Sequence, residues 1–210
     1  MSVRSDYDAW ADSYDAAPNR TRDLEATALR TMLANNPFEH VLELGCGTGK
    51  NTGWLGERAS HVTAVDFSPG MLAIARQRHA LPNVDFVQGD ITDAWAFTQA
   101  PADLVTCSLI LEHVHDLGHV FAQAARTMRP GAMFYVGELH PFRQYRGSRA
   151  RYEDGHGVAR EIDAVVHHVS DYLDAARSAG LACVQLREWF DDDDRTRLPR
   201  LLTLLFRHGG

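Results

Sequence analysis

The chain has 210 residues, of which 45% are hydrophobic and 23% charged, with a formal net charge of −7. This composition is typical of a globular protein with a sizeable core. The acidic balance argues against a nucleic-acid partner, because phosphate contacts need a basic surface. No stretch approaches the ~20 apolar residues that span a bilayer, and residues 1–20 lack an apolar signal core. Three cysteines without a disulfide pattern suit a reducing compartment. We therefore predict a cytoplasmic protein without a membrane partner.

An aromatic stripe opens the chain. Tyr7, Trp10 and Tyr14 fall on one side of a predicted helix, at spacings of three and four residues. Such a stripe indicates either a small helix packed on the body or a lid over a site, and the pattern does not decide between them. A second, amphipathic helix is predicted over residues 21–34.

Residues 41–51 combine a short apolar strand with glycines at every second position, Gly45, Gly47 and Gly49, before a helix over residues 52–58. Strand, glycine turn and helix form the ligand-binding start of a doubly wound α/β sheet. A dinucleotide-binding loop would need its third glycine at position 50, which is Lys50. This difference argues against a dinucleotide-linked oxidoreductase.

The pattern Glu43-x-Gly45-x-Gly47-x-Gly49 resembles the first motif of class I S-adenosylmethionine-dependent methyltransferases. The resemblance implies a Rossmann-like fold with a seven-stranded, mostly parallel sheet of order 3-2-1-4-5-7-6, whose last strand is antiparallel. It also implies S-adenosylmethionine as cofactor and S-adenosylhomocysteine as product. Glycines would let the backbone lie against the methionine and ribose of the cofactor. Members of this family often begin with repeated Tyr-Asp pairs, which favours the lid for Tyr7.

Two acidic residues follow the next strands. The second strand, residues 62–66, ends in Asp66, where a Rossmann-type fold places the carboxylate that accepts from two ribose hydroxyls. Asp66 could instead cap the helix predicted over residues 69–78. The third strand, residues 83–88, precedes Asp90 and Ile91, which the resemblance assigns to the adenine.

The fourth strand begins at residue 102 and ends near Ser108 and Leu109, and the Glu-His-Val segment beyond it resembles the fourth motif of the family. Strand ends of this kind face ligands in open α/β sheets. The predicted cofactor-binding residues are Tyr14, Glu43, Gly45, Gly47, Gly49, Asp66, Phe67, Met71, Asp90, Ile91, Ser108 and Leu109.

The acceptor side is predicted from the fifth strand onward. A helix over residues 118–128 ends at residues 129–131, the strand covers residues 132–138, and an irregular, arginine-containing connection covers residues 141–166. We expect Tyr7 and His140 to be catalytic. His140 is either a general base or a hydrogen-bonding pillar at the strand end. The predicted substrate-binding residues are Tyr7, His113, Glu138, His140, Arg143, Arg146 and His168.

The carboxyl-terminal part predicts a helix capped by Ser170, a strand over residues 181–188, a solvated acidic turn at residues 191–194 and a last strand over residues 201–206. Two strands without an intervening helix form an antiparallel hairpin, a hallmark of the family that the chain resembles. We predict one domain over residues 1–210. Its parts are a lid and helix (1–36), a cofactor-binding core (37–140), a substrate-side insertion (141–167) and a terminal helix and hairpin (168–210).

The expected function is methyl transfer from S-adenosylmethionine to an N or O atom of a small molecule. The arginines of the insertion favour a polar or anionic acceptor. A non-catalytic S-adenosylmethionine-binding protein is the main alternative, and a dinucleotide-linked oxidoreductase is a weaker one. The histidine pairs at positions 113 and 115 and at 167 and 168 lack a metal-ligand spacing, so we expect no metal. The sequence leaves open a monomer or a homodimer.

Overall fold

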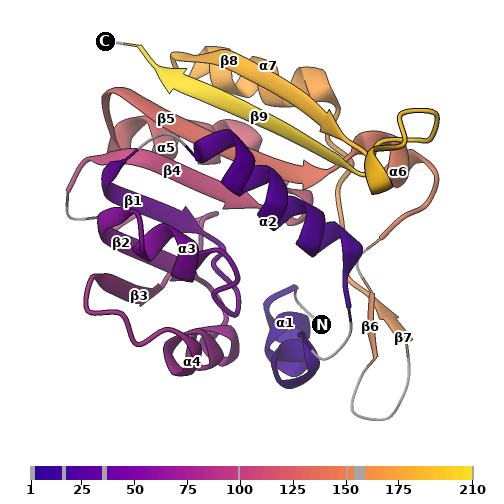
Figure 1. Cartoon of the computed structure of the whole chain (residues 1–210), viewed down its shortest axis with the longest axis horizontal. Helices are drawn as coiled ribbons and strands as arrows, with labels where there is room; N and C mark the ends of the chain where they lie inside the picture. The colour runs from indigo at the N-terminus through magenta and orange to yellow at the C-terminus, as the bar shows by residue number, and fades with distance from the viewer. Residues whose placement is uncertain are drawn as a thin grey trace.

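One large sheet organises the molecule (Figure 1). The computed structural model describes residues 3–15, 18–34, 37–98, 100–149, 151–153 and 159–209. Within these residues, seven strands pair in the order β3-β2-β1-β4-β5-β9-β8. Strand β9 runs antiparallel to both β5 and β8, and the other pairs are parallel. The predicted order and the antiparallel last strand are confirmed. The strands are β1 (Phe38–Leu44), β2 (Ala59–Asp66), β3 (Val84–Gln88), β4 (Ala102–Ser108), β5 (Met128–Leu139), β8 (Leu181–Trp189) and β9 (Leu201–His208).

Helices cover both faces of the sheet, because successive side chains of a strand point to opposite faces. Val41 and Leu104 pack in the apolar cluster of one face, with residues of α2, α3 and α4. Their neighbours Leu42 and Val105 pack in the cluster of the other face, with α5 and α7. The central strands β1 and β4 therefore bury apolar side chains on both faces, as expected for the middle of a sheet that is covered on both sides. The helices are α2 (Arg20–Leu33), α3 (Thr52–Gly56), α4 (Pro69–Arg78), α5 (Leu117–Thr127) and α7 (Val169–Ser178).

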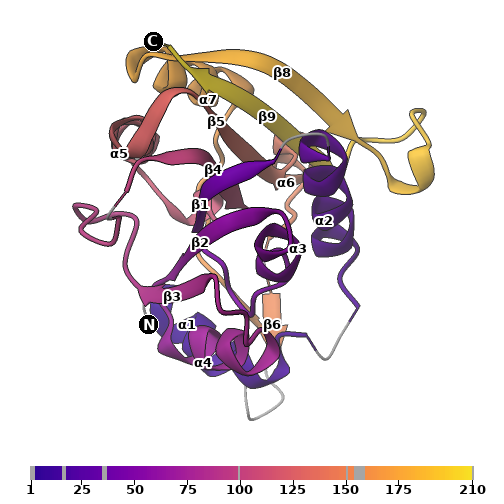
Figure 2. The same cartoon turned by 60° about the vertical axis from the view of Figure 1, so that its left-hand side comes forward.

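The amino-terminal helix α1 (Val3–Trp10), which continues into η1 (Ala11–Ser13), packs against α4 (Figure 2). Asp8 of α1 accepts hydrogen bonds from the Ser68 hydroxyl and, at 3.4 Å, from the Gly70 amide. These contacts attach α1 to the first turn of α4, directly after Asp66. Among the described helices, none has the length and apolar character to cross a membrane.

The connection after β5 has more regular structure than predicted. Helix α5 ends at Thr127, beside the predicted end, and residues 129–131 belong to β5, which begins earlier than predicted. His140 caps the short helix α6 (Pro141–Tyr145), and β6 (Arg151–Glu153) pairs with β7 (Ala159–Glu161) in a hairpin. The prediction of an irregular segment over residues 141–166 is therefore wrong for these described parts.

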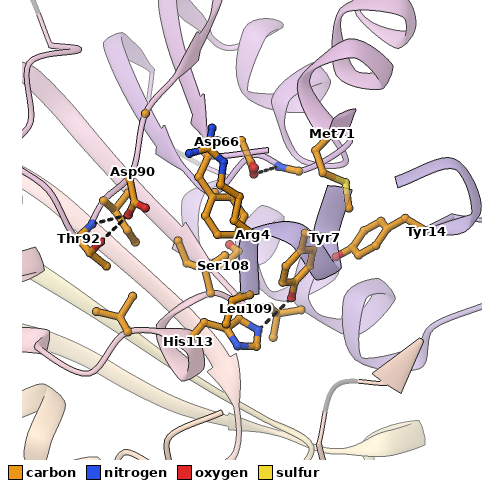
Figure 3. A pocket seen from close by; sticks show the side chains of 18 residues that line it. Arg4, Tyr7, Tyr14, Asp66, Met71, Asp90, Thr92, Ser108, Leu109 and His113 are labelled. Atoms are coloured by element: carbon orange, nitrogen blue, oxygen red, sulfur yellow. Dashed lines mark hydrogen bonds between the residues drawn. The ribbon is translucent and has the colours of Figure 1, made fainter. Parts of the chain in front are cut away.

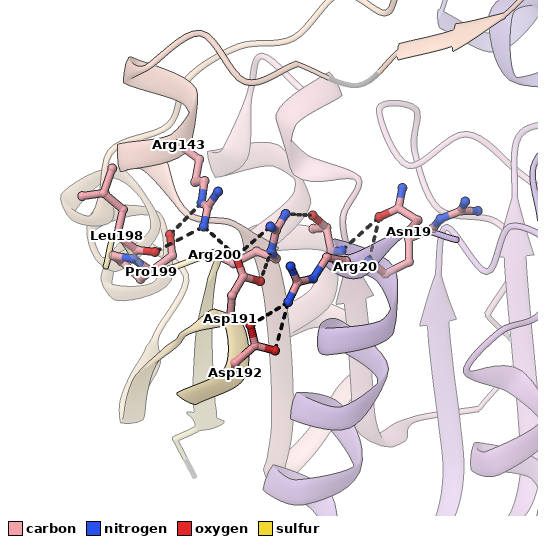
Figure 4. A network of polar contacts seen from close by, with 10 residues as sticks. Asn19, Arg20, Arg143, Asp191, Asp192, Leu198, Pro199 and Arg200 are labelled. Carbon is pink, nitrogen blue, oxygen red and sulfur yellow. Dashed lines mark hydrogen bonds and ion pairs between the residues drawn. The ribbon is translucent and has the colours of Figure 1, made fainter. Parts of the chain in front are cut away.

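One local prediction in the carboxyl-terminal part is wrong and another holds only in part. His168, not Ser170, is the N-cap of α7, and its amide donates to Asp171 at 2.8 Å. The acidic turn is exposed at Asp192 and Asp193, as predicted, but Asp191 is buried, because Arg200 and Arg143 donate to its carboxylate (Figure 4). The first residue of the acidic turn thus ties α6 to the start of β9.

Candidate functional site

A cavity of about 280 Å³ opens at the carboxyl ends of the central strands, with α1 along one side (Figure 3). It lies where open α/β sheets bind ligands. Most of the residues that the sequence singled out line this cavity. These are Tyr7, Tyr14, Gly45, Gly47, Asp66, Phe67, Met71, Asp90, Ile91, Ser108, Leu109 and His113.

The glycines of the loop after β1 have different surroundings. Gly47 has a φ of +54°, lines the cavity, and a Cβ added to it would meet no atom within 4 Å. Gly45 has a φ of +64°, and its Cβ would lie 2.5 Å from Ile110. Gly49 does not line the cavity, and its Cβ would lie 2.8 Å from the ring of His79. Gly47 therefore keeps space open for a ligand, whereas Gly49 permits close packing against His79.

Asp66 holds the glycine loop and the start of α4 together. One carboxylate oxygen accepts from the Gly47 amide at 2.8 Å and the other from the Ser68 amide at 2.9 Å. Burial raises the pKa of Asp66 to about 6. The N-cap of α4 is Ser68, whose hydroxyl accepts from the Met71 amide at 3.1 Å. Ser68, and not Asp66, therefore caps α4, and the side chain of Asp66 lies at the cavity wall.

Asp90 stands at the other end of the cavity, in the turn after β3. Its Oδ1 atom accepts from the amide and the hydroxyl of Thr92, at 2.9 and 2.6 Å. These bonds fix the orientation of the carboxylate. They leave Oδ2 available to a donor in the cavity.

A second, smaller cavity of about 60 Å³ adjoins the first, since both are lined by Tyr14, Gly45, Gly47, Ser108 and Leu109. Its wall also includes Glu25 and Glu43. Glu43 accepts from the Thr52 hydroxyl at 2.6 Å, and burial raises its pKa to about 8. Glu25 accepts from Ser108 at 2.6 Å, and burial raises the pKa of this carboxyl too. Buried carboxyls thus surround the glycine loop.

Arg22 is a cation that the sequence interpretation missed. Its guanidinium lies 4.0 Å from the centroid of the Tyr14 ring and 3.2 Å from Asp15, and it lines the smaller cavity. Its Nε atom is buried and has no hydrogen-bond partner among the described residues. The position of Arg22 in its helix could have indicated an anion-binding role. Asn19 caps α2 and places Arg22 in the first turn, where a positive charge is unfavourable without an anion nearby.

Tyr7 and His113 meet at the side of the cavity opposite α4 (Figure 3). The Tyr7 hydroxyl lies 3.0 Å from His113 Nε2, and His113 Nδ1 lies 2.7 Å from the backbone oxygen of Asp163. The Tyr7 ring also contacts Trp10, Tyr14 and Phe67. The predicted aromatic stripe therefore packs as one cluster at the cavity.

The structure does not bring His140 to either cavity. His140 is 3% exposed, its Nε2 lies 3.1 Å from Glu188, and its Nδ1 accepts from the Phe142 amide at 3.2 Å. Burial lowers the pKa of this imidazole. Both ring nitrogens are thus used in holding α6 to β8, as in the hydrogen-bonding alternative.

Glu138 has a supporting position under the cavity. Its Oε1 atom accepts from the amides of Ile110 and Leu111, at 3.1 and 2.9 Å. The side chain is buried, and burial raises its pKa well above the usual carboxyl value. Glu138 therefore anchors the loop after β4 and does not line the cavity itself.

The other predicted substrate-binding residues also lie elsewhere. Arg143 pairs with Asp191 at 3.0 Å, and Arg146 is the exposed C-cap residue of the same short helix. His168 caps α7 and contacts Tyr145. Several cavity residues were not predicted, among them Val3 and Arg4, which lie one helical turn before Tyr7 on the stripe. The unpredicted lining residues are Val3, Arg4, Gly89, Thr92, Ile110 and Val114.

Sequence comparison gives a consistent result. A family model described as a methyltransferase domain matches residues 42–136. Malonyl-[acyl-carrier protein] O-methyltransferase of Serratia marcescens is 36% identical over 139 residues, which cover 66% of this chain and 53% of that protein. Trans-aconitate 2-methyltransferase of Acidovorax ebreus is 34% identical over 173 residues, covering 78% of this chain and 64% of that protein. The chain thus matches between about half and two thirds of the length of these relatives.

Solved structures extend the similarity to nearly the whole chain. The complex of DhpI with S-adenosylhomocysteine has a TM-score of 0.75 at 28% identity, covering 99% of this chain and 96% of DhpI. A putative S-adenosylmethionine-dependent methyltransferase from Listeria monocytogenes has a TM-score of 0.75 at 21% identity, covering 89% and 98% of the two chains, and shows the same fold. The motif order, the strand order and these similarities agree: residues 42–136 match a methyltransferase domain, and the chain has the fold of S-adenosylmethionine-dependent methyltransferases.

Proposed function

We propose that the protein transfers a methyl group from S-adenosylmethionine to a small-molecule acceptor. The observation that carries this proposal is the opening at Gly47. A glycine with positive φ keeps a side-chain-free space directly beside the buried carboxylate of Asp66. A cofactor with a ribose diol and a flexible amino-acid tail fits such a space, because the diol donates to the carboxylate and the tail lies along bare backbone.

The proposed cofactor-binding residues are distributed over the two cavities. Asp66 accepts from the ribose hydroxyls, while Asp90 Oδ2 accepts from the adenine amine beside the apolar side chain of Ile91. Arg22, whose Nε lacks a partner among the described residues, binds the carboxylate of the methionine part from the smaller cavity. When bound, the cofactor supplies a methyl group on a sulfonium.

The acceptor occupies the part of the larger cavity between the loop after β4 and α1. Leu109, Ile110 and Val114 give this part apolar walls, and Tyr7 and His113 supply its hydrogen-bonding groups. Curated relatives are named for small carboxylic-acid, quinone and carrier-bound acceptors, which supports a metabolite as substrate. Helix α1 closes the site to water, and positioning of the acceptor supplies most of the rate. We also expect a cytoplasmic location, in keeping with the three free thiols in the described chain.

Binding and turnover separate this function from its alternatives. S-adenosylhomocysteine should raise the melting temperature of the protein and NAD should not, since Lys50 replaces the third glycine of a dinucleotide loop. Methyl-labelled S-adenosylmethionine should then label a product when the protein is incubated with pools of small metabolites. Stabilisation by S-adenosylhomocysteine without any labelled product would favour the non-catalytic binding protein. Stabilisation by NAD alone would contradict the cofactor assignment.

A further inference from the structure

The hydrogen bonds of His113 define which nitrogen carries its proton. Nδ1 lies 2.7 Å from the backbone oxygen of Asp163, and a carbonyl oxygen only accepts. Nδ1 is therefore protonated in the neutral ring, and Nε2 is left as an acceptor. The Tyr7 hydroxyl, 3.0 Å from Nε2, donates to it. The remaining acceptor capacity of the Tyr7 oxygen is free for a donor in the cavity, which both side chains line.

Carboxyl groups lie close to the ring of His113. The side chain is 8% exposed, and Glu112 Oε1 lies 3.8 Å from Nε2. Gln144 donates to the other Glu112 oxygen at 3.0 Å and holds that carboxylate in place. Asp66, Glu138 and Tyr14 are the further titratable groups that act on Tyr7. Arg4 of α1 is the cationic side chain in the lining of the larger cavity.

We propose that Tyr7 and His113 form a proton relay that accepts the proton of a hydroxyl group on the methyl acceptor. This inference rests on the proposed methyl transfer. As the acceptor oxygen bonds to the methyl carbon, the S–CH3 bond breaks and its electron pair stays on sulfur. The acceptor proton passes to the Tyr7 oxygen, and the Tyr7 proton passes to His113 Nε2. The ring becomes an imidazolium beside Glu112 and returns its proton to water after the methylated product leaves.

The same geometry selects the chemical class of the acceptor. A carboxylate is already deprotonated near neutral pH and has no proton to give to the relay. It would also approach the carboxyl group of Glu112, which lies 3.8 Å from His113 Nε2. A neutral hydroxyl needs a base at the moment of transfer, and the apolar walls at Ile110 and Val114 suit a compact apolar body. The structure thus assigns a hydroxyl-bearing, largely apolar acceptor, in place of the anionic one expected from the arginines of the insertion.

Helix α1 must be in position for the relay to exist. Tyr7 and His113 are 106 residues apart in the chain, and Tyr7 reaches His113 only because α1 packs on α4 and Asp8 accepts from Ser68. The base is therefore assembled by the same closure that excludes water from the cavity.

The test compares acceptors and variants in parallel. The probes are panels in which one carbon skeleton is offered as an alcohol or phenol, as an amine and as a carboxylic acid, each with S-adenosylmethionine. The proteins are the wild type, Tyr7→Phe, His113→Gln and the control Tyr145→Phe. Tyr145 also contacts a histidine, His168, but outside the cavities. Turnover is measured against pH, and S-adenosylhomocysteine affinity is measured by calorimetry.

The wild type should methylate hydroxyl members in preference to the others. Tyr7→Phe and His113→Gln should lower kcat for them by about 10²- to 10⁴-fold, the usual range for general-base catalysis, with little change in S-adenosylhomocysteine affinity. The ascending limb of the wild-type pH profile should disappear in His113→Gln, and Tyr145→Phe should behave as the wild type.

Two results would overturn the relay and differ in what they leave standing. Equal methylation of carboxylates by the wild type and Tyr7→Phe would exclude the relay but keep the proposed methyl transfer. Methylation of no panel member, with S-adenosylhomocysteine bound, would count against the proposed function and the relay together.

Discussion

The cofactor side and the acceptor side of the cavity are built differently. The cofactor side comes from the glycine loop and the turns after β2 and β3, within residues 45–92. The contacts that shape this side join residues close in the sequence or involve backbone amides. Asp66, for example, accepts from the amides of Gly47 and Ser68. The acceptor side joins Tyr7, His113 and the backbone of Asp163, which are 106 and 50 residues apart. One wall of the cavity is thus formed mainly by backbone, and the opposite wall by side chains that are far apart in the sequence.

Substitutions on the two walls should therefore affect binding and stability differently. On the cofactor wall the backbone forms the site, so a side chain added to it competes with the ligand. Away from that wall, charged side chains of the insertion form ion pairs, as Arg143 does with Asp191 and Arg151 with Glu161. Substitutions there should change stability and leave binding intact.

The largest effect is expected for Gly47→Val. The new side chain would fill the space beside Asp66, so S-adenosylmethionine binding should fall below detection by calorimetry while circular dichroism shows a folded protein. Gly131→Val is a matched control, because Gly131 also has a positive φ, +81°, with no atom within 4 Å of an added Cβ. The control should lose stability and keep cofactor binding. Comparable binding by both variants would contradict the cofactor site.

Asp66→Ala should weaken S-adenosylmethionine binding by about 1.5–3 kcal/mol, the range for hydrogen bonds to a charged group. Asp103→Ala is the control at the opposite end of the sheet. Asp103 likewise accepts from two backbone amides, those of Glu39 and His40 at 2.8 and 2.9 Å. Calorimetry should show weaker binding of S-adenosylmethionine for Asp66→Ala and unchanged binding for Asp103→Ala. An unchanged affinity for Asp66→Ala would remove Asp66 from the ribose site.

The buried carboxyl of Glu43 predicts a pH effect on the ligand-free protein. Its pKa rises from 4.5 to about 8 in the folded state. Below pH 4.5 both states are protonated. Between pH 4.5 and about 8 the unfolded chain releases a proton that the folded chain keeps, so the free energy of unfolding should fall as the pH rises.

Glu43→Gln should flatten this decline, and Glu57→Gln, at a side chain 71% exposed, should not. Urea unfolding at several pH values measures the slopes. Asp66, with a pKa of about 6, contributes in the same direction at the lower end of the range and remains in both variants. Parallel curves for Glu43→Gln and the wild type would show that Glu43 does not keep its proton on folding.

The smallest effect separates two arginines of α6. Arg143→Ala should cost about 1–2 kcal/mol of unfolding free energy, because it removes the ion pair with buried Asp191 (Figure 4). Arg146→Ala, on the same helix and exposed, should stay within about 0.5 kcal/mol of the wild type. Neither should change the KM of the acceptor. A raised acceptor KM for Arg143→Ala at unchanged stability would restore the role expected from sequence.

The features that the sequence predicted correctly depend on short-range patterns. The sheet order was implied by the family resemblance that the glycine motif carries, and Ser68 with Pro69 marked the start of α4 at the observed residue. The pairing of Arg143 with Asp191, 48 residues away, had no local signal. His140 likewise lies at the predicted strand end, but its partner Glu188 comes from a distant strand. The roles of the cavity residues and the lid stay predictions, and only the gathering of those residues is confirmed.

The attachment of the loop after β4 has a consequence for laboratory evolution of this protein. Leu109 has a φ of +58°, its amide donates to the Gly137 oxygen at 2.8 Å, and Glu138 accepts from the next two amides. The path of this loop is therefore held by the Gly137 backbone oxygen and the Glu138 carboxyl group of β5, which accept from backbone amides of the loop. Libraries that vary the side chains at positions 110 and 114 can reshape the acceptor wall on an unchanged frame. In libraries that also vary positions 137 and 138, most variants would lose the hydrogen bonds that hold this loop.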